Sequence, residues 1–143
     1  MMNKVAIVYF SGTGNTEIMA KAVLEGVNCA GKEGVLISSC IFNRSDIESY
    51  EGIAFGCPPL GAEALEEYEF EPMFANIESS LLGKRIFLFG SYGWGNGKWM
   101  DEWRERCTEN GAILVCEPVI CKEEPDERIC TELKKAGKIL AEK

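Results

Sequence analysis

The segment YFSGTGNTE, from Tyr9 to Glu17, places two glycines among four hydroxyl or amide side chains, between an apolar run and a helical pattern. Glycines let a backbone approach a ligand closely, and the first amides of a helix attract anions. The segment contains no lysine, arginine or histidine, so an anion here would be held by neutral donors. It matches neither G-x-G-x-x-G, which needs glycine at Glu17, nor the P-loop, which needs Gly-Lys-Ser/Thr. We therefore predict binding of a terminal monophosphate, with a plain glycine-rich turn and helix cap as the alternative.

A second segment, GSYGWGNGKW (90–99), carries three aromatic side chains among four glycines. Glycine on both sides of Trp94 allows an unusual backbone that could expose the indole, and such a ring suits a flat ligand. Trp99 stands four residues before Trp103, at helical spacing. We predict a ligand contact for Trp94 and a place in the core for Trp99.

The elements that must position these segments alternate along the chain. The run 4–10 is nearly continuously apolar, as expected for a strand buried on both faces. A shorter, weaker strand is predicted at 34–40, and further strands at 52–57, 84–91 and 112–120. Helical spacing follows the first run, in Ile18, Met19, Ala22, Val23 and Val27, and recurs at 71–81, 98–109 and 126–141. The stretch 41–51 is ambiguous, with a short helix beginning at Ser45 or Asp46 as one interpretation.

This alternation predicts an α/β fold, a three-layer doubly wound sandwich around a five-stranded parallel sheet. At 143 residues the chain is expected to form a single domain, 1–143. In such sheets a ligand lies beyond the carboxyl ends of the strands. That rule selects the loops 11–16, 57–69 and 91–97.

Composition limits the remaining possibilities. No apolar run approaches the roughly 18 residues of a membrane span, and the N-terminus lacks the pattern of a secretory signal, so we expect a cytoplasmic protein. The seven cysteines include no C-x-x-C pair and histidine is absent, which argues against a metal centre. We interpret several of the cysteines as small buried hydrophobes in a reducing compartment.

The net charge of −8 is concentrated in one stretch. Between Arg44 and Lys84 there are nine acidic residues and no basic one. An acidic face repels nucleic acids and anionic membranes and steers basic protein partners. The alternative is a solvated surface whose charge only keeps the protein in solution.

Three segments together resemble the flavodoxin family, and most closely its short-chain clostridial type. They are SGTGNT after the first strand, GCPPLGAEALEEYEFEP (56–72) after the third, and LFGSYGWGNGKWMDEW (88–103) after the fourth. The resemblance covers essentially the whole chain and implies the strand order 2-1-3-4-5. It also implies a monomer that binds FMN non-covalently and carries single electrons at low potential, through oxidised, semiquinone and hydroquinone states. Its partners would be redox proteins, oxidoreductases of the ferredoxin-using kind, which dock transiently at the acidic face.

Site residues carry over position by position. The resemblance implies that the phosphate is held by the first loop, through Ser11, Gly12, Thr13, Gly14, Asn15 and Thr16. Trp94 would stack on the outer face of the isoalloxazine and Leu60 on the inner face, while the pyrimidine edge would meet the amides of Ser91, Tyr92 and Gly93.

The second loop would tune the flavin. The Gly61–Ala62 peptide would face flavin N5, and Glu63 would accept from N3–H. Because Gly61 can reach positive φ, this peptide could turn its carbonyl toward N5–H in the semiquinone and so separate the two one-electron steps. The five glutamates within 63–71 would oppose the anionic hydroquinone and lower the second potential.

Two residues depart from the family pattern. Pro58 stands where relatives commonly carry a serine that helps to hold the phosphate, and the Pro58–Pro59 pair stiffens the loop. Ala62 replaces an acidic residue beside the flipping glycine. An alternative function on the same fold is a flavin-dependent NAD(P)H or quinone reductase, for which this short chain leaves little sequence. A response-regulator receiver is disfavoured, because it needs acidic residues after the first strand.

Overall fold

We describe a computed structural model of the chain, which covers residues 3–10, 12, 14–60, 64–93 and 95–142. The strands are β1 (Lys4–Tyr9), β2 (Glu33–Ser38), β3 (Gly52–Gly56), β4 (Pro59–Leu60), β5 (Ala64–Leu65), β6 (Arg85–Tyr92), β7 (Ile113–Leu114) and β8 (Val119–Lys122). The α-helices are α1 (Asn15–Cys29), α2 (Phe70–Ile77), α3 (Lys98–Glu109) and α4 (Glu127–Ala141). Short 3₁₀ helices are η1 (Ser39–Ile41), η2 (Arg44–Ser49) and η3 (Glu78–Ser80).

A parallel sheet forms the centre of the molecule, in the order β2-β1-β3-β6-β7, with β8 also paired to β6. This confirms the predicted order 2-1-3-4-5. The fifth position differs in one respect, because the single strand expected over 112–120 is two short strands. β7 pairs with the beginning of β6 and β8 with its end. Pro118, which has no N–H to donate to a ladder, stands directly before β8.

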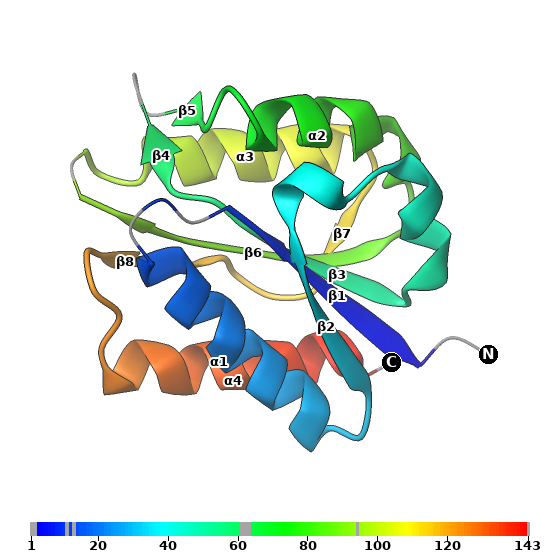
Figure 1. Cartoon of the computed structure of the whole chain (residues 1–143), viewed down its shortest axis with the longest axis horizontal. Helices are drawn as coiled ribbons and strands as arrows, with labels where there is room; N and C mark the ends of the chain where they lie inside the picture. The colour runs from blue at the N-terminus through cyan, green and yellow to red at the C-terminus, as the bar shows by residue number, and fades with distance from the viewer. Residues whose placement is uncertain (1–2, 11, 13, 61–63, 94, 143) are drawn as a thin grey trace.

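Helices cover both faces of this sheet. α1 and α4 lie on one side and α2 and α3 on the other (Figure 1), which confirms the three-layer architecture. The range predicted for α3 is the range observed, and α4 begins at the Asp126 cap, whose side chain accepts from Ile129 N–H at 2.9 Å. Among the helices that the structure describes, none combines the length and the apolar character needed to cross a bilayer.

Two segments are better defined than the sequence indicated. The ambiguous stretch 41–51 contains η2, which begins earlier than expected because Asn43 caps it and Asp46 completes the capping box. The loop after β3 contains an unpredicted antiparallel pair, β4 with β5, in which Pro59 lies opposite Leu65. This pair is a small hairpin standing apart from the main sheet, near the start of α2 (Figure 1).

Candidate functional site

The three loops selected from the sequence leave neighbouring strands at one edge of the sheet. Tyr9, the last residue of β1, is paired with Gly56, the last residue of β3, and Gly56 is paired with Phe89 of β6. Since neighbouring strands are about 4.8 Å apart, the ends of β1 and β3 lie side by side, and β6 runs beside them before it continues from Phe89 to Tyr92 at the same edge. Figure 1 shows them gathered at the end of the molecule opposite the N-terminus.

The loop after β1 leads directly into α1. Its last residue, Gly14, is the N-cap and has a φ of 98°, in the left-handed region that favours glycine. The first amides of an α-helix have no partner inside the helix, and a glycine cap offers them no side-chain acceptor. Gly12 is exposed, Asn15 is half-buried and Thr16 is buried. Ser11 and Thr13 lie outside the described residues.

The loop after β3 begins with a firmly held residue. Cys57 is fully buried, its N–H donates to Phe89 O at 3.2 Å, and its carbonyl accepts from Trp99 Nε1 at 3.1 Å. Trp99 is therefore in the core, as predicted, and it also anchors this loop. Pro58 is half-buried and Pro59 is buried in β4. Leu60 is described only as backbone of β4, and Gly61, Ala62 and Glu63 lie outside the described residues.

The thiol of Cys57 is poorly suited to redox chemistry of its own. Burial raises its pKa far above the usual range, a backbone hydrogen bond from Glu66 offsets only part of this rise, and the nearby carboxylates of Glu66 and Glu71 add to it. A thiol must ionise to react as a nucleophile. Cys57 is thus a buried structural residue beside the loop, in line with the interpretation of the cysteines as small hydrophobes.

The loop after β6 is tied to the connection between β8 and α4. The hydroxyl of Ser91 donates to the carbonyl of Glu123, and the N–H of Glu123 donates to Tyr92 O at 2.7 Å. The ring of Tyr92 packs on Trp99, with centroids 5.5 Å apart. Gly93 is exposed, and Trp94 lies outside the described residues.

Sequence reasoning missed two residues at this edge. Glu123 has a φ of 61°, a conformation that costs a side-chain-bearing residue energy, and no sequence signal marked it. Glu66 was counted with the acidic face but is only 5% exposed, and its carboxylate accepts from three backbone N–H groups. No sequence signal marked its burial, because it stands among four other glutamates within 63–71.

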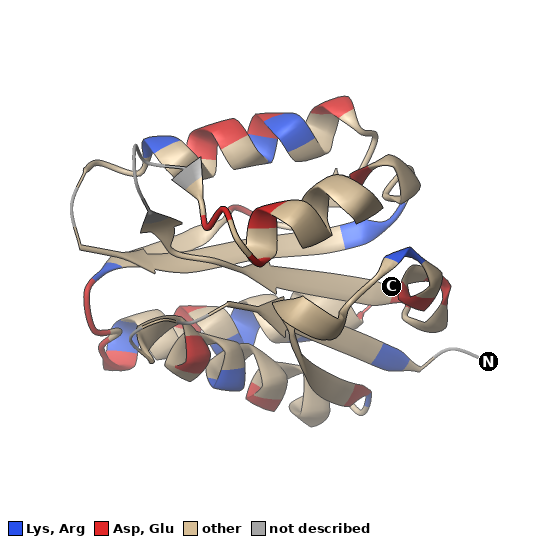
Figure 2. Cartoon of the chain, turned by 45° about the horizontal axis from the view of Figure 1, so that its top comes forward, with Lys and Arg blue, Asp and Glu red and all other residues tan. Residues whose placement is uncertain are grey.

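The acidic stretch is less uniform than its sequence suggests. Glu71 and Glu78 both pair with Arg106, and Glu51 pairs with Lys32 at 2.8 Å. Glu48 and Glu67 are exposed. Figure 2 shows acidic positions near the start of α2 and along the loop that follows β8, with basic positions interspersed. Fewer than nine free carboxylates are thus exposed in the stretch between Arg44 and Lys84. The exposed Glu123 and Glu124 add negative charge from outside that stretch.

The donor set at this edge suits an anionic group joined to a flat ring. Neutral hydroxyl, amide and backbone donors precede α1, while the loops after β3 and β6 carry apolar and aromatic residues. Among the described residues, no group of three potential ligands could hold a metal ion. One open hollow of about 640 Å³ lies elsewhere, between η2 and α2, where it is lined by Arg44, Ile47 and Asn76. We therefore place the candidate site at the three loops.

Comparisons with known proteins point to one family. A family model described as Flavodoxin matches residues 7–136. The relatives include a flavodoxin from Clostridium beijerinckii, 44% identical over 121 residues, which covers 85% of this chain and 88% of the relative. A flavodoxin from Megasphaera elsdenii is 40% identical over 133 residues, 93% of this chain and 97% of the relative. The solution structure of the two-electron reduced Megasphaera elsdenii flavodoxin superimposes with a TM-score of 0.87, over 96% of this chain and 98% of that one.

Proposed function

The chain belongs to the flavodoxin family and is an FMN-binding electron carrier, and we propose that it holds the flavin across the loops after β1, β3 and β6. Its role is to pass electrons between redox proteins rather than to turn over a substrate of its own. Bound FMN supplies the redox chemistry, and the protein contributes binding, orientation and the electrostatic surroundings.

The phosphate end belongs to the loop before α1. Gly14 has no side chain with which to cap α1, and the first amides of a helix are suited to a phosphate. The side chains of Ser11, Thr13, Asn15 and Thr16 add neutral donors, with the backbone of Gly12. The observation that carries the proposal is this glycine-capped helix start, set at the same sheet edge as two loops rich in glycine and aromatic residues.

The ring belongs between the other two loops. Trp94 would cover one face and Leu60 the other, with the amides of Ser91, Tyr92 and Gly93 along the pyrimidine edge. The Gly61–Ala62 backbone would face N5, and the carboxylate of Glu63 would accept a hydrogen bond from N3–H of the ring. Pro58 and Pro59 would border this pocket without donating hydrogen bonds.

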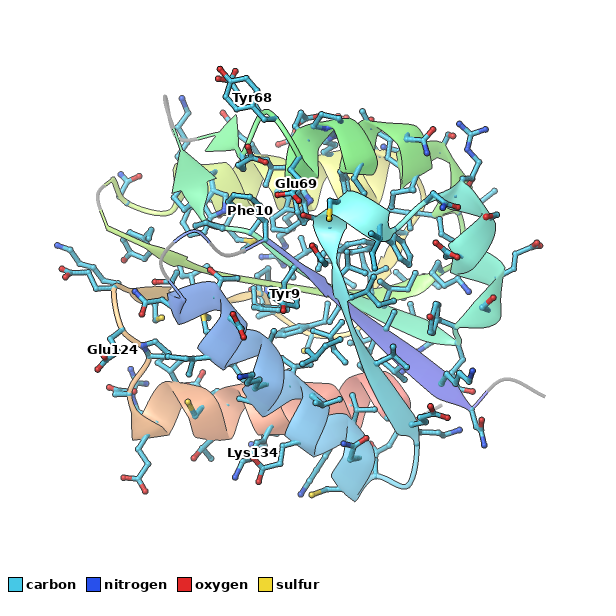
Figure 3. The ribbon with its side chains drawn as sticks, in the orientation of Figure 1. Tyr9, Phe10, Tyr68, Glu69, Glu124 and Lys134 are labelled. Carbon is cyan, nitrogen blue, oxygen red and sulfur yellow. The ribbon has the colours of Figure 1, made fainter. Side chains whose placement is uncertain are left out.

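Partners are expected to dock at the rim of the same edge. Tyr68 is 85% exposed beside the exposed Glu67, and it projects outward near β4 and β5 (Figure 3). Glu123 and Glu124 extend the negative charge on the side of β8. Charge of one sign around a redox group speeds encounter with basic partners while leaving the complex weak.

Stepwise anaerobic reduction, followed by visible absorption, tests the proposal. We expect the purified protein to bind one FMN and to show long-wavelength absorbance at half-reduction, before the flavin bleaches. A protein that stays colourless when FMN is added would contradict the cofactor assignment. Sustained turnover of NAD(P)H by the protein alone would instead support the reductase alternative.

A further inference from the structure

We propose that Glu66 is a positioning residue, which fixes the outgoing arm of the β4–β5 hairpin to the start of α2 and so holds the flavin loop in its binding conformation. This inference rests on the proposed function, since it assumes that the tip of this hairpin meets the ring of FMN.

The carboxylate of Glu66 is buried and fully used. One oxygen, Oε1, accepts from the N–H of Glu69 at 2.7 Å and from that of Phe70 at 2.8 Å. The other oxygen, Oε2, accepts from the N–H of Tyr68 at 2.8 Å. The side chain therefore reaches forward to the turn that follows it and accepts three hydrogen bonds from that turn. Bonds to a charged acceptor are about twice as strong as neutral ones.

These three amides have a special position in the chain. They belong to the turn that leads into α2 and to the first residue of that helix, where amides lack partners within the helix. The N-cap residue of α2, Glu69, makes no side-chain capping bond. Glu66 supplies the missing cap from three residues upstream, and its negative charge is favourable at a helix N-terminus.

The cap is joined to the flavin loop through the hairpin. Leu65, directly before Glu66, is paired with Pro59 on the opposite arm. The incoming arm is held at Cys57 by β6 and by the indole of Trp99, and the outgoing arm is held at Glu66. The carbonyl of Glu66 also accepts from Glu71 N–H at 2.7 Å, inside α2. Both described arms of the hairpin are therefore anchored, and loss of the Glu66 cap would release one of them.

The neighbouring residue provides a matched control. Glu67 carries the same charge one position along the chain, but it is exposed. Glu66→Gln and Glu67→Gln each remove one negative charge from the same turn. Only the first places an amide nitrogen, a donor, among three N–H donors. A pure charge effect on the flavin predicts similar behaviour of the two variants, whereas positioning predicts a difference.

The experiment uses the full chain, stripped of FMN and titrated with FMN while the quenching of flavin fluorescence is followed. We expect Glu66→Gln to raise the Kd for FMN about tenfold or more, because without the cap only a minor fraction of the apoprotein has the loop in its binding conformation. Glu67→Gln is expected to change it less than about threefold, as for an exposed charge. The two one-electron midpoint potentials of the bound flavin are measured in parallel, and their separation is expected to shrink in Glu66→Gln relative to Glu67→Gln.

Each outcome bears on one statement. Wild-type protein that binds no FMN overturns the proposed function. Wild-type protein that binds FMN, while both variants show the same Kd and the same separation of potentials, overturns the positioning role even if Glu66→Gln unfolds more easily. If Glu66→Gln does not fold, Glu66→Asp is used in its place, because it keeps the charge and shortens the side chain by one methylene. Weakened FMN binding by Glu66→Asp supports positioning, and unchanged binding overturns it.

Discussion

The two helical layers hold the same sheet by different means. On one face α1 and α4 cross so closely that a Cβ added at Gly26 would overlap the carbonyl oxygen of Lys134. One added at Gly137 would overlap the carbonyl oxygen of Val23. On the other face α2 and α3 are joined by large rings, with Phe74 and Trp103 edge to face at 5.8 Å.

This difference bears on where the site can be adjusted. At Gly26 and Gly137, the layer of α1 and α4 (the glycine layer) has backbone against backbone, so no side chain could move aside at these two positions. The aromatic layer carries the two loops proposed to hold the ring, which lead into α2 and α3, and there single side chains such as Trp99 and Glu66 anchor the loops. The loops that can be adjusted through single side chains thus lead into α2 and α3. The loop proposed to hold the phosphate leads into α1, whose position against α4 is fixed by backbone contacts.

The largest expected effect is the loss of a ring from the aromatic layer. Phe74 is fully buried, contacts Phe55 at 5.3 Å between centroids, and lies beneath the guanidinium of Arg106 at 5.0 Å. Phe74→Ala is expected to lower the free energy of unfolding by about 4 kcal/mol, the usual cost of a cavity of this size. Urea unfolding of the apoprotein measures it, and a loss below about 1 kcal/mol would show that the layer can collapse around the gap.

Adding a single methyl group tests the glycine layer. Gly26→Ala is expected to cost about 3 kcal/mol, because the new Cβ meets backbone and the helices must separate. The control is Lys21→Ala, on the exposed side of the same helix, where the side chain is 62% exposed and little change is expected. Equal stability of the wild type and Gly26→Ala would mean that α1 and α4 slide freely, and the contrast between the layers would be lost.

A smaller effect, with a pH signature, is expected for Arg106. Its guanidinium donates to Glu71 and Glu78, and this pairing lowers the pKa of Glu78 below its usual range. A carboxyl whose pKa is lowered by folding stabilises the protein above its unfolded pKa, and that stability is lost as the pH falls through the folded pKa. Arg106→Leu is therefore expected to cost about 2 kcal/mol at pH 7.

The difference between wild type and Arg106→Leu should then shrink as the pH falls below about 4.3, the ordinary pKa of glutamate. Lys98→Leu is the matched control on the same helix, since Lys98 and Glu102 form an exposed pair at 3.7 Å. Such pairs contribute little, so Lys98→Leu should change neither the stability nor its dependence on pH. A constant difference between Arg106→Leu and wild type from pH 7 to pH 3 would assign the effect of Arg106 to packing on Phe74.

The layers could be predicted well because long helices and strands leave a clear pattern of apolar residues in the sequence. The helix over 98–109 follows from the helical spacing of its apolar residues and the strands from apolar runs, while the strand order was implied by the resemblance. The β4–β5 hairpin was missed because strands of two residues are too short to show alternation. The role of Glu66 was missed for a related reason: a run of glutamates reads as surface charge, and burial of one of them depends on how the chain turns back after β5.

The site itself was predicted as three loops, and the sheet does bring their starting points together. What the sequence could not supply was the support behind them. Ser91 was expected near the ring through its amide, yet its hydroxyl holds Glu123, a contact between segments 32 residues apart. No local pattern encodes such a pair, since it arises only once β8 lies beside β6.

The smallest effect is expected where the two layers meet. Glu123 lies in the loop leading to α4, in the glycine layer, but it is bonded to Ser91 and Tyr92, whose loop leads to α3 in the aromatic layer. Its positive φ favours glycine, so Glu123→Gly relieves about 1 kcal/mol or more of strain and forfeits part of it through the greater freedom of the unfolded chain. A net gain in the free energy of unfolding of about 0.5 kcal/mol is expected, because the carbonyl that accepts from Ser91 and the N–H that donates to Tyr92 belong to the backbone and survive the substitution.

Glu124→Gly, which removes the same charge from a neighbour without positive φ, should lose stability instead. If both variants lose stability equally, the side chain of Glu123 contributes to the junction, and the link between the layers is not the backbone alone.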